Sequence, residues 1–405
     1  MPNKNTSTKF IFGKSGLLPQ EEILETLKQQ KKLVIGIPKE NTTIENRVGL
    51  TPEAVELLVN NGHEVIIESG AGWAANYSDN DYSESGGYII KERKEIFLCD
   101  IILKIAPLSV EEIALLKGNQ VVLSSLNLST RNEEYIRMLI KKRVTAIALE
   151  EIKDNNNNYP VIRSMSEIAG TTSILIAAEY LSNNHNGKGV LLGGITGITP
   201  TEVVILGAGN AAEYAAKAAL GLGATIKVFD NSITKLKQLQ RNLSSQIYTS
   251  VFHLQVLKKS LKSADVLIGA IHKDDYYQIF VTEDMIKDMK NGSVIIDMSI
   301  DQGGCIETSR VTSHQNPIFT KYGVIHYCVP NIASRVARTA SIALSNVFAP
   351  LLLDIANAGG IKNHFKDNMG IRNGVYIYNG ILTNNEIGNL FGIPSKDIDL
   401  LMAAF

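Results

Sequence analysis

The sequence predicts an α/β protein built from two doubly wound domains. Short apolar runs alternate with helical patterns along most of the 405 residues, which is typical of a sheet covered by helices on both faces. The runs at 33–37 and 145–150 lack polar alternation, as expected for parallel strands that are buried on both sides. The chain is long enough for two such domains, at about 150 residues per domain.

The first 150 residues are expected to form one sheet. Further strand-like runs lie at 64–68, 100–105 and 120–125. A helix is expected between the first two strands, because Thr51 stands at an N-cap position and Pro52 at the first helical position. These residues therefore make a layered α/β domain on their own.

The middle of the chain is expected to connect the two domains. Four asparagines at 155–158 indicate a loop, which we interpret as the tip of a hairpin. Ser164 and Glu167 match a capping box, which predicts a long helix from there to about Leu181. This helix is expected to cross from the first domain to the second. Strand-like runs that begin at residue 202 and continue to residue 329 predict the second sheet.

The C-terminal part is expected to return to the first domain. An apolar helix is predicted at 339–358, and two short helical patterns follow between 384 and 403. Packing of this tail on the first domain makes that domain discontinuous. The predicted boundaries are 1–160 plus 338–405 for the first domain and 161–337 for the second.

Charge and composition point to small-molecule ligands. Lysine and arginine total 40 against 41 acidic residues, and aromatic residues make up 6%, so neither a nucleic acid nor an anionic membrane surface is an expected partner. The apolar run 341–356 is interrupted by Pro350 and is expected to fall short of a bilayer span. The first ten residues contain no secretory signal.

The cysteines and histidines indicate neither disulfides nor a metal site. Cys99, Cys305 and Cys328 are widely spaced and form no CxxC motif, which is typical of reduced thiols in a cytoplasmic protein. The seven histidines show no spacing of metal ligands.

A complete strand, glycine turn, helix and strand lies at 202–230. Gly207 permits the tight turn, Gly209 leaves room for a pyrophosphate at the positive start of the helix, and Ala212 takes the third small position. Asp230 lies 23 residues beyond Gly207, where an acid binds the ribose. Its charge favours NAD over NADP, because it repels a 2′-phosphate. The alternative is a tight turn without a ligand; we interpret the unit as a Rossmann-like domain that binds NAD.

Other polar residues stand where strands are expected to end. Arg47 lies in a loop between a strand and a helix, where its guanidinium could hold a substrate carboxylate; the alternative is a solvated loop arginine. Asp301 follows the strand-like run 292–300 and is a candidate for moving protons, with a turn-forming aspartate as the alternative. Asp297, within that run, could instead be a buried and paired carboxylate.

Several segments together resemble the L-alanine dehydrogenase family and its relative, the NAD-binding domain of nicotinamide nucleotide transhydrogenase. They are GIPKENTTIENRVGLTP, RSMSEIAG, GVLLGGITGITP, VVILGAGNAA, IDQGGCIETSR and HYCVPNIAS. The resemblance covers nearly the whole chain beyond residue 33, and IDQGGCIETSR followed by YCVPN is particularly similar to the dehydrogenases. It implies two α/β domains with the nicotinamide in the cleft between them, oxidative deamination of L-alanine to pyruvate and ammonium, and a homo-hexamer.

The resemblance also implies roles for single residues. Arg47 resembles the arginine that holds the substrate carboxylate, and Asp301 the aspartate that assists proton movement beside the nicotinamide. Four further residues resemble positions on the cofactor: Asp230 on the ribose, Lys235 near the adenosine, and Ser166 and Asn331 along the cofactor cleft. From the sequence alone, Ser166 can also be an ordinary serine in the first turn of a helix.

Two positions depart from the family pattern. The stretch LKIAP places Ala106 where the family has a lysine on the substrate, and SLNLS places Asn127 where the family has a catalytic histidine. Lys104 faces the same side of the strand as Ala106 and could reach the same pocket; the alternative is a lysine that extends to solvent at the sheet edge. Asn127 can orient a carbonyl but cannot titrate near pH 7, which leaves proton transfer to Asp301 or to a bound water.

Two functions therefore follow from the sequence. The first is an NAD-dependent alanine dehydrogenase with Arg47, Lys104, Asn127 and Asp301 at its site. The alternative is an NAD(H)-binding protein without amino-acid turnover, either transhydrogenase-like or regulatory, because of the replacements at Ala106 and Asn127.

Overall fold

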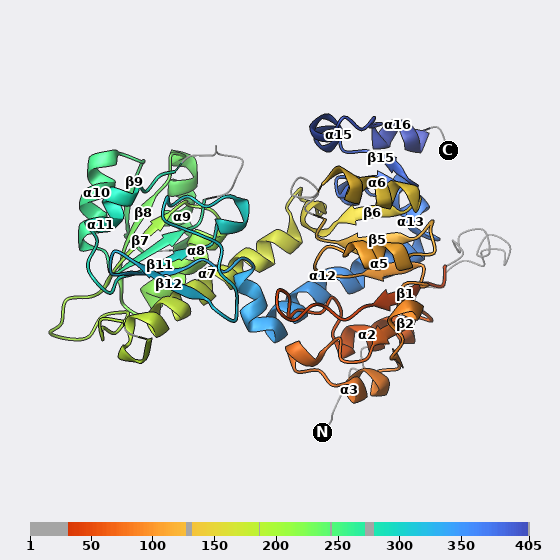
Figure 1. The fold of residues 1–405 in the computed structure, drawn as a ribbon, viewed down its shortest axis with the longest axis horizontal. Helices are drawn as coiled ribbons and strands as arrows, with labels where there is room; N and C mark the ends of the chain where they lie inside the picture. The colour runs from red at the N-terminus through yellow and green to blue at the C-terminus, as the bar shows by residue number, and fades with distance from the viewer. Residues whose placement is uncertain (1–30, 127–131, 186, 244, 272–278, 404–405) are drawn as a thin grey trace, which may run out of the picture.

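Two sheets form two lobes that lie side by side in the computed structural model (Figure 1). The structure describes residues 31–126, 132–185, 187–243, 245–271 and 279–403. Helices α7 (Pro160–Leu181) and α12 (Ala337–Asn357) run between the lobes. The predicted fold class, α/β with two doubly wound domains, is confirmed.

The first lobe contains an eight-stranded sheet in the order β15-β14-β6-β5-β4-β1-β2-β3. Its strands are β1 (Val34–Ile37), β2 (Glu64–Glu68), β3 (Tyr88–Ile90), β4 (Ile101–Leu103), β5 (Val121–Ser124), β6 (Thr145–Ala148), β14 (Val375–Tyr378) and β15 (Ile381–Leu382). The strands β1 to β6 pair in parallel, whereas β14 pairs antiparallel with β6 and with β15. The chain therefore returns from the second lobe to complete the first sheet.

Helices cover this sheet, and their ends follow local sequence signals. They are α2 (Pro52–Asn60), α3 (Asp79–Glu84), α4 (Arg93–Ile96), α5 (Val110–Leu115), α6 (Glu133–Lys141), α13 (Ile361–Asp367), α14 (Met369–Arg372), α15 (Asn385–Phe391) and α16 (Ile398–Ala403). Thr51 and Pro52 begin α2 as predicted, although the Thr51 side chain makes no capping hydrogen bond. The two short helices predicted for the tail are α15 and α16.

The second lobe contains a seven-stranded sheet in the order β12-β13-β11-β10-β7-β8-β9. Its strands are β7 (Glu202–Leu206), β8 (Thr225–Phe229), β9 (Tyr248–Ser250), β10 (Val266–Gly269), β11 (Val294–Asp297), β12 (Ile318–Lys321) and β13 (Val324–Tyr327). Its helices are α8 (Asn210–Gly221), α9 (Ile233–Leu243), α10 (Leu254–Ser263) and α11 (Glu283–Lys287). Apart from the antiparallel β12, the pairing is parallel.

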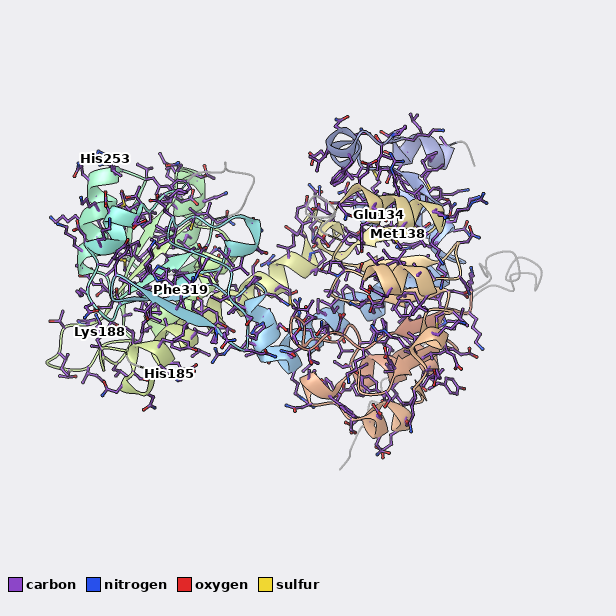
Figure 2. All side chains as sticks on the ribbon, viewed as in Figure 1. Glu134, Met138, His185, Lys188, His253 and Phe319 are labelled. Atoms are coloured by element: carbon purple, nitrogen blue, oxygen red, sulfur yellow. The ribbon has the colours of Figure 1, made fainter. Side chains whose placement is uncertain are left out.

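The strands absent from the sequence prediction include all four sheet edges. These are β3 and β15 in the first sheet and β9 and β12 in the second. Each of these edge strands is two to four residues long and none is fully buried, so none shows as a long apolar run. Phe319 lies on the edge strand β12 and is only partly buried, and Figure 2 labels its side chain in the second lobe.

Two predictions for the connection between the lobes are wrong. Helix α7 begins at Pro160, four residues before the predicted start, and the Ser164 hydroxyl donates to the carbonyl oxygens of Pro160 and Val161 at 2.9 and 3.1 Å instead of capping the helix. The stretch 155–158 is a turn and not the tip of a hairpin. The Asp154 carboxylate organises this turn by accepting from nearby backbone N–H groups.

The apolar helix predicted at 339–358 is α12, which continues through Pro350. By length and composition alone, Ile332–Asn357 could cross a membrane, with a mean hydropathy of 1.5 over an 18-residue window, and the buried core helix of a soluble protein passes the same test. Phe348, Leu352 and Ile355 are fully buried in the core of the first lobe. These are the contacts of a core helix.

Candidate active site

Each sheet has one point where the strand order reverses. In the first sheet it lies between β1 and β4, and in the second between β7 and β10. Loops that leave such neighbouring strands in opposite directions open a crevice at the carboxyl ends, where α/β proteins bind ligands. Of the sequence-predicted site residues, Arg47, Lys104, Gly207 and Gly209 lie on the loops at these two points.

The glycine turn follows β7 at the reversal point of the second sheet. Gly207 has a φ of 101°, and a Cβ atom there would lie 2.4 Å from the carbonyl oxygen of Ala270, so the fold itself requires glycine. Gly209 differs, because a Cβ atom there would meet no atom within 4 Å. The turn therefore leaves open space at the start of α8. Ala212, in the first turn of α8, is fully buried against the sheet.

The Asp230 carboxylate binds this turn directly. It follows β8, is 8% exposed, and accepts from the backbone N–H of Ala208 at 2.8 Å and of Ser232 at 2.7 Å. The structure thus brings Asp230 and the glycine turn together. Lys235 lies in the first turn of α9 with an exposed side chain, and its backbone N–H donates to the Ser232 hydroxyl at 3.2 Å.

Helices α7 and α8 pack so closely that only glycine fits at Gly170. A Cβ atom there would lie 2.2 Å from the carbonyl oxygen of Ala211. Ser166 stands one turn before Gly170 on the same face of α7 and is partly buried. This face is therefore directed at the helix that begins with the glycine turn.

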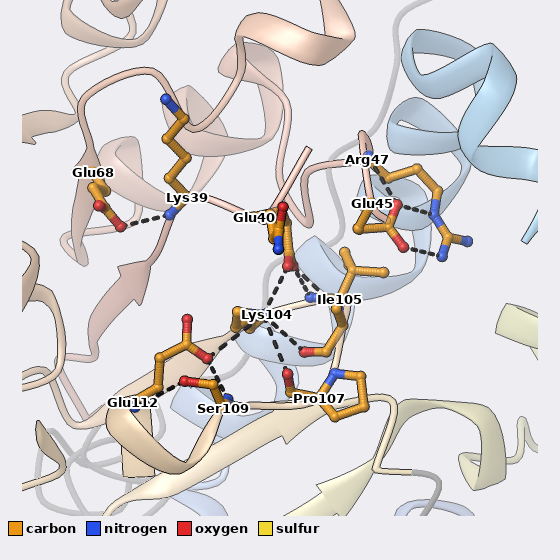
Figure 3. A network of polar contacts seen from close by, with 12 residues as sticks. Lys39, Glu40, Glu45, Arg47, Glu68, Lys104, Ile105, Pro107, Ser109 and Glu112 are labelled. Atoms are coloured by element: carbon orange, nitrogen blue, oxygen red, sulfur yellow. Dashed lines mark hydrogen bonds and ion pairs between the residues drawn. The ribbon is translucent and has the colours of Figure 1, made fainter. Parts of the chain in front are cut away.

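Arg47 lies on the loop after β1 and is nearly buried, at 9% exposure, so the solvated alternative is wrong. Its guanidinium binds the Glu45 carboxylate through two parallel contacts, from Nε to Oε1 at 2.8 Å and from Nη2 to Oε2 at 2.6 Å (Figure 3). Its Nη1 lies 3.0 Å from the Met165 sulfur. Burial acts to raise the pKa of Glu45, but the Arg47 guanidinium outweighs it and holds that pKa below its usual range.

Residues of the second lobe hold the loop that carries Arg47. The Asn331 side chain donates to Glu45 Oε2 at 2.7 Å, and the Ser334 hydroxyl accepts from the backbone N–H of Asn46 at 2.8 Å. Asn331 has a left-handed backbone with a φ of 62° at the start of a short helix that leads into α12. The predicted substrate and cofactor residues Arg47 and Asn331 therefore share one partner, Glu45.

Lys104, at the carboxyl end of β4, lies in a buried ionic network (Figure 3). It is 4% exposed, its Nζ is 2.8 Å from Glu40 Oε2 and 3.7 Å from Glu112 Oε2, and it donates to the carbonyl oxygens of Ala106 and Pro107. Lys104 therefore does not extend to solvent at the sheet edge. Burial raises the pKa of Glu40 to about 7, although the Lys104 ammonium acts to lower it.

The two candidate aspartates after β11 differ in environment. Asp297, the last residue of β11, is fully buried, and one of its oxygens accepts from the backbone N–H of Ser299 at 3.1 Å. Burial raises the pKa of Asp297 to about 6. Asp301 lies in the following helical turn and is exposed. Asn127 lies outside the described residues.

His314 is a site residue that the sequence reasoning missed. Its Nε2 is buried and has no hydrogen-bond partner among the described residues. Burial lowers the pKa of His314, while the nearby Glu45 carboxylate acts to raise it and the Arg335 and Arg47 guanidinium groups to lower it. The Glu45–Arg47 pair therefore acts electrostatically on this imidazole. The only sequence signal was a titratable residue shortly after IDQGGCIETSR.

Family models match both lobes. The "Alanine dehydrogenase/PNT, N-terminal domain" model matches residues 36–169, and the "Alanine dehydrogenase/PNT, C-terminal domain" model matches residues 173–385.

Individual relatives match along most of the chain. Alanine dehydrogenase 2 of Staphylococcus aureus (strain USA300) is 37% identical over 367 residues, which cover 90% of this chain and 98% of that protein. The alanine dehydrogenase of Staphylococcus saprophyticus is 36% identical over 369 residues, which cover 91% and 99%. A solved structure of an L-alanine dehydrogenase superposes with a TM-score of 0.83 at 34% identity, over 89% of this chain and 99% of that one. The transhydrogenase from Sinorhizobium meliloti, at 22% identity and a TM-score of 0.74 over 87% and 99%, is similar in fold.

Proposed function

Because the chain belongs to the alanine dehydrogenase/PNT family, we propose that it is an NAD-dependent dehydrogenase that converts L-alanine and water to pyruvate and ammonium, and that works in both directions. The strongest support is Arg47, whose guanidinium is buried at the reversal point of the first sheet and is bound through Glu45 to the second lobe. In this proposal residues 1–160 plus 338–405 bind the substrate and residues 161–337 bind the cofactor.

NAD fits the glycine turn of the second lobe. The open space at Gly209 allows a pyrophosphate to approach the first N–H groups of α8. Each oxygen of Asp230 accepts one backbone N–H, which leaves lone pairs for the ribose hydroxyls. The bound nicotinamide supplies the acceptor for the hydride from the 2-carbon of alanine. Ser166, Asn331 and Lys235 are proposed to complete the cofactor site.

The remaining site residues are proposed to act on the substrate. Arg47 binds its carboxylate, Asn127 orients the reacting group, and Asp301 takes up the proton that the alanine ammonium group loses before hydride transfer. The protons of the attacking water then pass to the departing nitrogen, which leaves as ammonium. Lys104 supplies a positive charge beside the Ala106 and Pro107 carbonyl oxygens, where the family's substrate lysine is missing. We also propose a cytoplasmic homo-oligomer; all three cysteines are free and buried.

The test is NADH oxidation with pyruvate and ammonium. We expect turnover by the wild type and a fall of at least about 100-fold in kcat/KM for Arg47→Ala, because two charge-assisted hydrogen bonds to the carboxylate are lost. The NADH dissociation constant, measured by fluorescence, should stay the same. Arg137→Ala is the matched control, since Arg137 is an exposed arginine on α6 that pairs with Glu133 alone among the described residues.

The alternative is an NAD(H)-binding protein without amino-acid turnover. The observation that favours it is the environment of Lys104, whose ammonium is already paired with Glu40 and lies near Glu112. NADH binding without turnover on a panel of 2-oxo acids with ammonium would support this alternative and exclude the dehydrogenase.

A further inference from the structure

The Arg47 guanidinium is bound along one edge only. Its five N–H groups form two edges that can each grip a carboxylate, one made by Nε and Nη2 and the other by Nη1 and Nη2. Glu45 occupies the first edge with contacts of 2.8 and 2.6 Å. At the second edge, the described residues offer Nη1 only the Met165 sulfur, a weak acceptor. A buried cation with unfilled donors on one edge indicates a ligand there.

Glu45 has no capacity left for any other partner. Its Oε1 accepts from the backbone N–H and the Nε of Arg47, and its Oε2 accepts from Arg47 Nη2 and from Asn331 Nδ2. Four donors fill the lone pairs of a carboxylate. Arg47 also holds the pKa of Glu45 below its usual range, so Glu45 stays ionised and is only a weak base near neutral pH. Its role is to hold its neighbours.

We propose that Glu45 is a positioning residue, which fixes Arg47 along the Nε–Nη2 edge so that the Nη1–Nη2 edge grips the carboxylate of a 2-oxo or 2-amino acid. Asn331 anchors Glu45 from the second lobe, so the orientation of Arg47 depends on contact between the lobes. The substrate carboxylate takes the place of the Met165 sulfur on Nη1. The substrate class rests on the proposed dehydrogenase function.

A competing role for Glu45 makes the opposite prediction. If Glu45 occupied the place of the substrate carboxylate, removing its charge would free the guanidinium and strengthen carboxylate binding. Glu45 lies on the side edge of Arg47 and leaves the end edge open, which argues against competition. A positioning role predicts weaker binding on removal of the charge, because Arg47 loses its fixed orientation.

The experiment measures carboxylate binding apart from turnover. Pyruvate is titrated by calorimetry into the full-length protein saturated with NADH and without ammonium, so that reductive amination cannot proceed. For Glu45→Gln we expect the pyruvate dissociation constant to rise about 10- to 100-fold, and the NADH dissociation constant to change less than twofold. In turnover assays KM should rise while kcat changes less than about threefold. Glu45→Asp keeps the charge on a shorter side chain and should lose only a few-fold.

Ser334→Ala is the matched control. It removes the neighbouring bond between the lobes, to the backbone N–H of Asn46, and leaves Glu45 and Asn331 in place. Unchanged pyruvate binding in this variant, together with the loss in Glu45→Gln, supports the proposal. Equal or tighter binding in Glu45→Gln overturns it, as does an equal loss in Ser334→Ala. A wild type that binds pyruvate without turnover rejects the dehydrogenase and leaves Glu45 to be judged on binding. A wild type that binds no 2-oxo acid overturns both.

Discussion

Gly207 and Gly209 are two residues apart, yet they are glycines for different reasons. Gly207 is enclosed by the protein, with a positive φ and the Ala270 carbonyl oxygen where a side chain would start. Gly209 borders open space and has an ordinary extended backbone, with a φ of −84°. The fold requires glycine at position 207, whereas Gly209 leaves open space at the start of α8.

This contrast predicts opposite effects of two alanine substitutions. Gly207→Ala should lower the free energy of unfolding by at least about 1–3 kcal/mol, because the backbone must leave a strained conformation or the turn must open. Gly209→Ala should leave that free energy within about 0.5 kcal/mol of the wild type and raise the NADH dissociation constant at least about tenfold. Urea unfolding and NADH fluorescence measure the two quantities. Normal NADH binding by Gly209→Ala would show that the turn does not face the pyrophosphate.

The site residues that the sequence could predict are those with local signals. Asp230 and the glycine turn belong to one strand-turn-helix-strand unit, and the structure brings them into contact. The contacts of Glu45 were beyond sequence reasoning, because Asn331 lies 286 positions away in the chain. In the sequence, Glu45 is one of several charged residues in a polar loop. The structure shows that Arg47 and Asn331 both bind its carboxylate.

At the scale of elements, α12 supports the loop that carries Arg47 as well as the core. The hydroxyl oxygens of Ser341 and Ser345 accept from the backbone N–H groups of Val48 and Thr51 at 2.9 and 2.7 Å. Both serines are buried, at 0% and 3% exposure. The two polar residues that interrupt the apolar face of α12 therefore bind the loop that carries Arg47.

Replacing either serine should weaken this support. Ser341→Ala and Ser345→Ala each leave a buried backbone N–H without an acceptor, which should lower the free energy of unfolding by about 1–3 kcal/mol. The KM for pyruvate should change less than about threefold, since Glu45 still holds Arg47 in these variants. Thr339→Ala, at an exposed position of the same helix, should change stability by less than about 0.5 kcal/mol. Urea unfolding and steady-state kinetics test this, and equal stability of the serine variants and the control would contradict it.

Elements with long apolar patterns could be predicted, and short or competing ones could not. The buried strands β1, β4 and β5 were found because their residues face helices on both sides. The edge strands were not found, because each is only two to four residues long and none is fully buried. At α7, Pro160 is a stronger signal for the start of the helix than the capping-box pair Ser164 and Glu167 that follows it. The sequence pattern alone does not say which of the two signals is the stronger.

For the whole molecule, buried histidines limit stability in acid. His326 is fully buried between Thr308, 2.8 Å from its Nε2, and the Val324 carbonyl oxygen, 3.0 Å from its Nδ1, and it stacks on Phe319. A carbonyl oxygen only accepts, so Nδ1 carries the proton and Nε2 accepts from the Thr308 hydroxyl. Burial lowers the pKa of His326 to about 4.

The chain should therefore lose stability as the pH falls from about 6.5 to about 4. In this window the unfolded histidine binds a proton that the folded one does not, which costs about 2 kcal/mol between pH 7 and pH 5. His326→Gln should lose this part of the pH dependence, although it is less stable at pH 7. His253→Gln, at the exposed outer end of the second lobe (Figure 2), should keep it. Urea unfolding at pH 7 and at pH 5 measures the free energy of unfolding of each variant. If this free energy changed equally with pH in His326→Gln and His253→Gln, the pH dependence would not belong to His326.

The overall architecture could be predicted from the sequence, but the contact between the lobes could not. The alternation of apolar runs with helical patterns predicted two doubly wound sheets, and the C-terminal tail was predicted to pack on the first of them. The antiparallel β14 and β15 that extend the first sheet were missed, although Asn379 and Gly380 between them are a typical signal of a two-residue hairpin turn. Contacts such as that of Glu45 with Asn331 depend on how two finished lobes meet.

That contact also sets the order in which the protein can become active during its synthesis. Glu45 and Asn331 are 286 positions apart. At 5–20 residues per second, a ribosome needs roughly 15 to 60 s to travel from one to the other. During that time the growing chain already contains Arg47 and Glu45, but Asn331, which holds Glu45, has not yet been synthesised. An incomplete chain can therefore fold its first strands before the proposed substrate site is complete.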